Sequence, residues 1–314
     1  MCAIFGFLDY GKKISYRLLT KLLKELSIAA ECRGTDATGI SYVKDGEMVT
    51  FKKAKPAHKV NLYFPKDTTA VIGHTRYTTQ GSEKQNYNNH PFEGVTDEQS
   101  FALAHNGVLH NDTALKRAYN LPVTKIETDS YVAVQLLEQQ NQVNMKSLKF
   151  VAEEVLGSFV FTVLRNDNML FLVKDSNPVT LYHFPELGLY VYASTKDILN
   201  RALKVAKFKA DAEEVFVKTG DILCIDNNGK LSSDSFEDEE DLDYFSSLRG
   251  YEEVVDEELE CDIDFVCHYF GADRSDIEAL LDYGYTMDEI EEMLLDDDYF
   301  NAALKLAKTL YEQW

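Results

Sequence analysis

The acidic residues of this chain are distributed so unevenly that they divide it into two parts. The 314 residues carry a net charge of −21. Residues 231–314 contain 27 Asp and Glu against 4 Lys and Arg, a net charge of −23, whereas residues 1–230 contain 26 acids against 28 bases, a net charge of +2. This composition predicts a near-neutral domain over residues 1–232, an acidic linker over 233–260 and a small helical module over 261–314.

The first part contains the patterns of a mixed α and β domain. Two β-type segments at 39–43 and 48–51 flank Asp45-Gly46, a dipeptide that predicts a hairpin. Further strands are predicted at 70–73, 101–105, 158–164, 169–174, 179–183, 189–193 and 215–225, and helices at 15–30, 129–140, 145–154 and 196–205. Two groups of antiparallel strands with helices between and after them favour an α+β layered domain with two sheets.

The acidic part contains two patterns typical of helix starts. Ser275 with Glu278, and Thr286 with Glu289, have the spacing of a capping box, in which a hydroxyl and a carboxylate bond the first free amides of a helix. Both precede apolar residues, so the sequence predicts a compact module of short helices.

Several classes of protein are excluded by composition. The sequence has neither a run of 18 apolar residues nor the basic-then-apolar order of a signal peptide, so we expect a cytoplasmic protein that does not contact a membrane. Five cysteines without CxxC spacing argue against a disulfide framework and a zinc ribbon, and we expect neither a metal nor a cofactor. The strong acidity argues against nucleic acid as a partner.

Cys2 directly follows the initiator methionine. Removal of that methionine would leave a thiol and an α-amine on one residue. An α-amine titrates at about 7.7 to 8.0, so it could act as the base for its own thiol near neutral pH. A cysteine that simply begins a buried strand would look the same, so the interpretation depends on partners elsewhere in the chain.

Four polar clusters lie where predicted strands end or helices begin, at residues 33–39, 73–81, 104–107 and 127–130. Arg76 directly follows a buried strand, and its guanidinium suits bidentate capture of a carboxylate. Asn106 and Gly107 could aim two donors at one oxyanion, each worth about 3 kcal/mol of barrier. Asp129 stands at a helix start, where it could pair with an ammonium group.

Each cluster also has a purely structural explanation. Arg76 could form a surface ion pair, Asn106-Gly107 a turn, Asp129 a helix cap, and Arg33 with its neighbours an ordinary loop. Taken together with an N-terminal thiol, however, the clusters supply everything needed to hold an α-amino acid and attack its side-chain carbonyl. The combination therefore favours a catalytic interpretation.

Six segments of the sequence resemble, in order, the class II glutamine amidotransferases of the N-terminal-nucleophile hydrolase superfamily. They are residues 2–6, 33–39, 73–77, 89–91, 105–107 and 127–129. The resemblance implies a four-layer αββα sandwich of two antiparallel sheets. It also implies L-glutamine as substrate, Cys2 as nucleophile, Asn106 and Gly107 as the oxyanion hole, Arg76 as the carboxylate receptor and Asp129 as the amine receptor.

The same resemblance implies secondary roles for other residues of these segments. His74 and Tyr77 would help to bind the substrate, and Arg33, Asn89 and His90 would support the site. Thr78 and Gln80 depart from the alanine and histidine more usual at these places. Both lie past Arg76, so we expect them to affect closure over glutamine rather than catalysis.

The resulting prediction is a glutaminase that hydrolyses L-glutamine through a γ-glutamyl thioester on Cys2 and supplies ammonia to a separate acceptor or synthase. The acidic module is then expected to be a docking element, either for such a protein or for the rim of the chain's own active site. Two alternatives stay open: an amidohydrolase of the same superfamily that acts on another γ-glutamyl or acyl amide, and a binding or regulatory homologue with reduced catalysis. Arg76 and Asp129 together favour free glutamine.

Overall fold

A computed structural model describes residues 2–236 and, beyond them, residues 267, 272–283, 285, 290, 293, 294, 300, 301, 303–305, 307 and 308. The chain divides into two compact units, Met1–Asp238 and Glu239–Trp314. Residue 232, the expected end of the first domain, lies inside strand β13 (Leu231–Ser235), which pairs with β12 (Asp221–Ile225). Residues 233–235 therefore belong to the first unit rather than to a linker, and residues 237–260 lie outside the described part.

The first unit is built on two antiparallel sheets. The remaining strands are β1 Ala3–Asp9, β2 Ala37–Lys44, β3 Glu47–Lys53, β4 Ala70–Arg76, β5 Phe92–Val95, β6 Ser100–Leu109, β7 Gly157–Arg165, β8 Leu170–Lys174, β9 Thr180–Phe184, β10 Leu189–Ala193 and β11 Glu213–Val215. The seven-stranded sheet has the order β11-β9-β10-β1-β4-β2-β3, and the six-stranded sheet has the order β13-β12-β8-β7-β6-β5. β1 is therefore a central strand.

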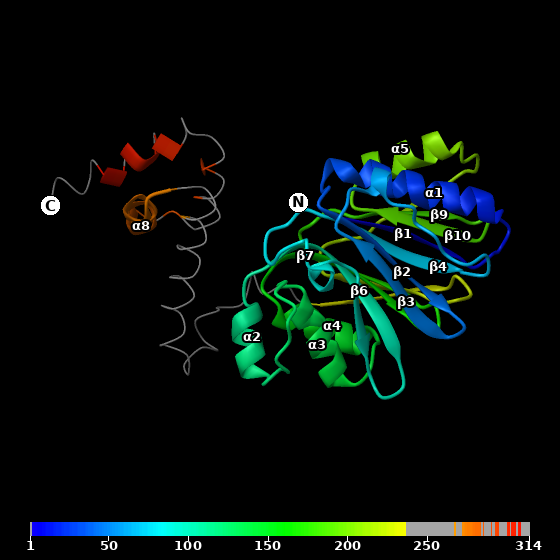
Figure 1. Cartoon of the computed structure of the whole chain (residues 1–314), viewed down its shortest axis with the longest axis horizontal. Coiled ribbons are helices and arrows are strands. Elements are labelled where there is room, and N and C mark those ends of the chain that lie inside the picture. The colour runs from blue at the N-terminus through cyan, green and yellow to red at the C-terminus, as the bar shows by residue number, and fades with distance from the viewer. Residues whose placement is uncertain are drawn as a thin grey trace. The chain divides into compact units, whose positions relative to one another are not determined.

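Helices cover the outer face of each sheet. α1 (Tyr16–Ala29) and α5 (Lys196–Ala206) lie together on the seven-stranded sheet, and α3 (Tyr131–Gln140) and α4 (Met145–Glu154) lie on the six-stranded sheet (Figure 1). α2 (Asp112–Ala118) packs beside α3. Short 3₁₀ helices span Ala30–Cys32, Ala57–Lys59 and Asn86–Asn88. This arrangement confirms the predicted four-layer αββα sandwich.

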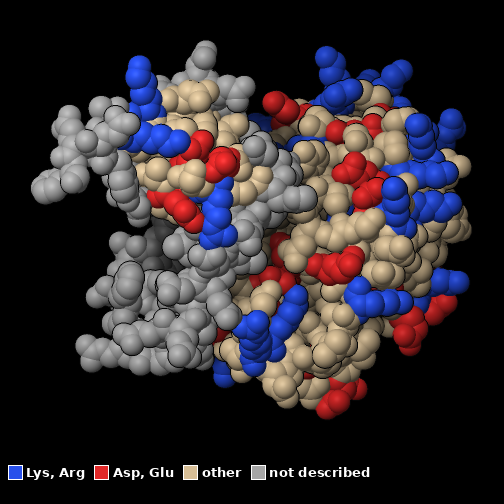
Figure 2. Space-filling view, turned by 60° about the vertical axis from the view of Figure 1, so that its left-hand side comes forward, with Lys and Arg blue, Asp and Glu red and all other residues tan. Residues whose placement is uncertain are grey.

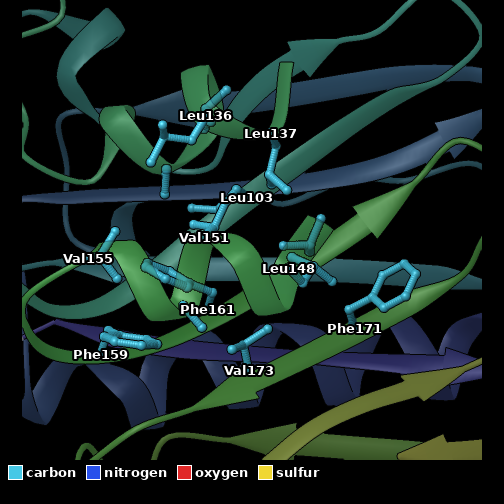
Figure 3. Close-up of a cluster of buried hydrophobic side chains, with 14 of the residues drawn as sticks. Leu103, Leu136, Leu137, Leu148, Val151, Val155, Phe159, Phe161, Phe171 and Val173 are labelled. Atoms are coloured by element: carbon cyan, nitrogen blue, oxygen red, sulfur yellow. The ribbon is translucent and has the colours of Figure 1, made fainter. Parts of the chain in front are cut away.

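Apolar side chains fill the three interfaces between the four layers. Along β1, Phe5 and Phe7 face α1 and α5, whereas Ile4 and Leu8 face the six-stranded sheet. Burial on both faces fixes the position of β1, because apolar surface removed from water contributes about 25 cal/mol per Å². The interface between the six-stranded sheet and its helices contains Leu103, Leu136, Leu148, Val151, Phe161 and Phe171 (Figure 3).

Most of the predicted elements are present, and the differences have local causes. The predicted hairpin joins β2 and β3, with Asp45 at φ 53° and Gly46 at φ 82°. The single strand predicted over 215–225 is wrong: β11 and β12 belong to different sheets, and the chain turns between them at Gly220 (φ 84°). β5, β13 and α2 were not predicted, because β5 has four residues, β13 is exposed and polar, and α2 is short.

The second unit has a small helical core of its own. α8 (Arg274–Tyr283) begins one residue before Ser275, and Asp273 Oδ1 accepts a hydrogen bond from Ser275 N at 2.9 Å. Asp273, not Ser275, therefore caps this helix start, while Thr286 and Glu289 lie outside the described residues. The described apolar side chains that pack together in this unit include Ile277, Leu280, Ile290, Met293 and Leu304.

The surface of the first unit agrees with its near-neutral charge. Both Lys and Arg side chains and Asp and Glu side chains lie on the face shown in Figure 2. Among the residues that the structure describes, no helix is both long and apolar enough to pass through a membrane.

Candidate active site

Cys2 stands immediately before β1, at the end of a strand that is paired on both sides. β4 and β10 flank β1 in antiparallel register. Ile4 N donates to Ser194 Oγ at 2.9 Å, and Ser194 N donates to Ile4 O at 3.0 Å. These bonds fix the backbone two residues from the thiol, so Cys2 projects from a rigid support.

The Cys2 thiol lies against the backbone of Tyr77. Tyr77 N donates to Sγ at 3.4 Å, and the thiol donates to Tyr77 O at 3.4 Å. Burial raises the pKa of Cys2 above its ordinary value, the Tyr77 amide and the Arg76 charge lower it, and the Asp129 charge raises it. The rise leaves the thiol protonated at neutral pH, so attack by Cys2 requires a base.

Arg33 joins the nucleophile to Asn106. Its Nε donates to Cys2 O at 2.8 Å, and its Nη2 donates to Asn106 Oδ1 at 3.3 Å. A guanidinium can only donate, so Asn106 must turn its oxygen to Arg33 and its Nδ2 elsewhere. Asn106 is buried, and its Nδ2 has no hydrogen-bond partner within the described part of the chain. The fold thus holds an available amide donor in a fixed relation to Cys2.

Gly107 lies where one edge of β6 is open. β5 pairs only with residues 100–103, so among the described strands β6 has no neighbour on that side beyond them. Gly107 is paired with Phe159 of β7. The N–H and the C=O of Phe159 both bond Asp175, and so they point away from β6. In an antiparallel pair of this kind, the N–H and C=O of both residues point away from the partner strand. The Gly107 amide is therefore directed to the open edge of β6. A Cβ at Gly107 (φ 146°) would lie 1.8 Å from Ser158 O, so only glycine fits.

Asp129 is buried beside the same edge. Its Oδ2 accepts from Leu109 N at 2.7 Å, and its Oδ1 accepts from Ser130 Oγ at 3.2 Å. The N-cap of α3 is Ser130, which makes no side-chain cap bond. Asp129 is therefore not a helix cap. Its carboxylate bonds the amide of Leu109, which lies two residues after Gly107 on β6.

Arg76, the last residue of β4, is 2% exposed, so its guanidinium is buried and does not form a surface ion pair with any described residue. Nη1 donates to Asn89 Oδ1 at 2.7 Å, and Nη2 donates to Gln80 O at 2.5 Å and Gly81 O at 3.0 Å. Burial lowers the pKa of the Arg76 guanidinium, while the charge of Asp129 raises it. These bonds hold the segment after Tyr77 over the end of β4.

Two histidines of the predicted site, His74 and His90, are buried. His74 was expected to bind substrate, but it is buried, and its Nε2 donates to His105 O at 2.9 Å. The His90 ring lies 4.3 Å from the His74 ring and 4.4 Å from the Phe92 ring, between centroids. Both histidines are therefore part of the buried support of the site, and a contact of His74 with substrate stays a prediction.

Several residues that hold the site were not singled out from the sequence. His105 Nδ1 bonds Ser130 Oγ at 2.7 Å and so supports Asp129, and Asp36 Oδ2 accepts from Thr78 N at 2.8 Å. Both lie in the segments 33–39 and 105–107 that resemble the amidotransferase family, and this resemblance is the signal that could have identified them. Asn88 Nδ2 donates to Glu127 Oε2 at 2.6 Å. Nothing in the local sequence distinguishes Asn88 from a solvated loop residue.

The buried histidines predict a loss of stability in acid. Burial lowers the pKa of His74 to about 3 and that of His90 well below its ordinary value of 6.5. The unfolded chain binds the proton more readily, so stability is complete above about pH 6.5 and falls as the pH drops below it. His74 alone should cost about 2 kcal/mol at pH 5.

Urea titrations followed by circular dichroism at pH 7.5 and pH 5 measure this difference. The control is His58→Gln, which removes an exposed histidine paired with Glu31 and should leave the pH difference unchanged. Equal stability of the first unit at both pH values would contradict the prediction.

The arrangement defines a class of protein: a two-sheet αββα sandwich whose candidate nucleophile stands at the start of a central strand. Residues 24–192 match the family model described as "Glutamine amidotransferases class-II". The chain belongs to this family of glutamine-using amidotransferases, whose nucleophile is an N-terminal cysteine.

Similarity to individual proteins agrees with this family membership. The chain is 32% identical over 187 residues to glutamine–fructose-6-phosphate aminotransferase (isomerizing) of Bacillus cereus, covering 57% of this chain and 30% of the relative. It is 30% identical over 242 residues to the Bacteroides thetaiotaomicron protein of the same name, covering 73% and 36%. The chain thus spans about a third of the length of these relatives.

Solved structures show the same fold. Glutamine phosphoribosylpyrophosphate amidotransferase from B. subtilis superimposes with a TM-score of 0.58 at 24% identity, covering 75% of this chain and 49% of that one. A structure described as the allosteric regulatory enzyme of purine biosynthesis gives a TM-score of 0.59 at 22% identity, with the same coverage.

Proposed function

We propose that this protein hydrolyses L-glutamine to glutamate and ammonia through a γ-glutamyl thioester on Cys2. The observation that carries the proposal is the bridge by Arg33, which bonds both the Cys2 carbonyl and the Asn106 side chain. One residue thereby sets the distance between a nucleophile and an amide donor whose Nδ2 has no partner among the described residues. Arg76 and Asp129 both act on the thiol electrostatically, and they supply opposite charges for the carboxylate and the ammonium of an α-amino acid.

The positions of these residues suggest the following reaction. The α-amine of a processed Cys2 takes the thiol proton as Sγ bonds to the side-chain carbonyl carbon of glutamine. The carbonyl oxygen becomes an oxyanion, which Asn106 Nδ2 and the Gly107 amide stabilise by about 3 kcal/mol each. The C–N bond then breaks, and the amine returns its proton to the departing ammonia. Water hydrolyses the thioester and restores the thiol.

We further propose that a separate acceptor or synthase uses the ammonia, docked by the acidic module at 261–314. The support is the net charge of −23 over residues 231–314. A basic partner surface would be attracted to such a charge, with a range of about 8 to 10 Å at physiological salt.

A substrate panel tests the central proposal. Protein whose mass shows an N-terminal Cys2 should release ammonia and glutamate from L-glutamine. It should act far more weakly on N-acetyl-L-glutamine, which lacks the ammonium that Asp129 would bind, and on L-asparagine, whose carbonyl falls one methylene short. Release from another γ-glutamyl amide, with none from glutamine, would replace glutamine as the substrate.

A further inference from the structure

We propose that Lys52 is a positioning residue that sets the affinity of the site for glutamine, by clamping residues 86–91 so that Asn89 holds Arg76 in place. The inference rests on the proposed function and extends it to a residue outside the matched segments. Lys52 lies on β3, the outermost strand of its sheet, and among the described residues its ammonium bonds Asn89 and Pro91 rather than Cys2 or Asn106.

Lys52 contacts both sides of His90. Its Nζ donates to Asn89 O at 2.6 Å and to Pro91 O at 3.1 Å, and lies 4.9 Å from the centroid of the Phe92 ring. Its own carbonyl accepts from Asn86 Nδ2 at 2.9 Å. A solvated surface lysine would not use its ammonium on two carbonyls and an aromatic face. The side chain therefore fixes a segment that lies between the sheet and the site.

Asn89 carries this constraint to Arg76. While its carbonyl is bonded to Lys52, its Oδ1 accepts from Arg76 Nη1 at 2.7 Å, and its Nδ2 donates to Glu83 O at 2.8 Å. Asn89 is fully buried, so its carbonyl would lose its lysine partner without gaining water. Loss of the ammonium should therefore displace Asn89 and with it the guanidinium of Arg76.

The charge of Lys52 changes within a pH range that kinetic assays can cover. Burial lowers the pKa of Lys52 to about 8, with Glu93 raising it and Arg76 lowering it. The other titratable groups facing it, His74 and His90, have lowered pKa values and are neutral there. As the pH rises through about 8, the ammonium loses a proton and its bonds to the two carbonyls weaken. The glutamine KM should then rise.

Steady-state kinetics of Lys52→Met and Lys52→Arg test the inference. Lys52→Met, which keeps the length but removes the charge, should raise the KM for glutamine about tenfold, with kcat within about twofold. Lys52→Arg should recover most of the affinity and shift the rise in KM to higher pH, because arginine does not titrate there. The matched control is Lys53→Met: its Nζ lies over the Phe51 ring at 5.6 Å, and its kinetics should not change.

The outcomes separate this inference from the proposed function. Wild-type protein that fails to hydrolyse glutamine overturns both. An active wild type with an unchanged KM in Lys52→Met, or a Lys52→Arg variant with the wild-type pH profile, overturns the Lys52 inference alone. If Lys52→Met fails to fold, the Lys52→Arg profile still decides.

Discussion

Cys2→Ala should reduce glutamine hydrolysis by more than about 10⁴-fold, because it removes the sulfur on which the proposed thioester forms. The fold should survive the change. Cys2 precedes β1, and the bonds that fix this strand begin at Ile4 and Ser194. Coupled assays for ammonia and glutamate measure the loss, and thermal melting by circular dichroism checks the fold.

The control for Cys2→Ala is Cys32→Ala, which removes an exposed thiol next to Arg33 and should retain full activity. The raised pKa of Cys2 adds a second expectation, because the thiol needs a base. Protein that retains the initiator methionine places its α-amine one residue away and should be inactive. Full activity in such protein, shown by intact mass, would exclude the α-amine as the base.

Asn106→Ala should lower kcat for glutamine by about 10² to 10³ and change KM little. Its Nδ2 has no partner in the described part of the resting protein, so the bond that it makes forms only as charge develops on the substrate oxygen. The variant also removes the bond from Arg33 Nη2 to Asn106 but keeps the bond from Arg33 Nε to the Cys2 carbonyl and the contacts of the thiol with Tyr77. Steady-state kinetics separate the two constants.

The control for this change is Asn111→Ala. Asn111 is also a buried amide near β6, but its Oδ1 accepts from Leu156 N and its Nδ2 donates to Glu154 O, both at 2.9 Å. Its removal should therefore lower stability and leave kcat unchanged. A raised KM with normal kcat in Asn106→Ala would make Asn106 a binding residue instead of an oxyanion donor.

Much of the fold could be predicted because its signals are local. The Asp45-Gly46 turn and the alternation of apolar residues identify strands over a few residues, and α1 and α5 have clear apolar faces. Sheet membership is different. The segment 215–225 reads as one strand, and only the turn at Gly220 (φ 84°) divides it between two sheets.

The site could be predicted only as far as its residue types are diagnostic. Arg76, Asn106 and Asp129 have chemistry that suggests a substrate, and the structure places all three around Cys2 or its support. The supporting contacts are between residues far apart in the sequence, such as Arg33 with Asn106, separated by 73 positions. Lys52 and Asn88 look like ordinary surface residues until the fold brings carbonyls and carboxylates to them.

The position of β1 has a consequence for the synthesis of the protein. Its two neighbours are residues 70–76 and 189–193, and Ser194 completes the support of Ile4. While the ribosome is still making residues 80–188, β1 can pair with β4 but has an open second edge. The nascent chain therefore carries its reactive thiol for most of translation without the strand that fixes it. Activity should begin only after residue 194 has emerged, because β1 gains its second neighbour and the Ser194 bond to Ile4 only then.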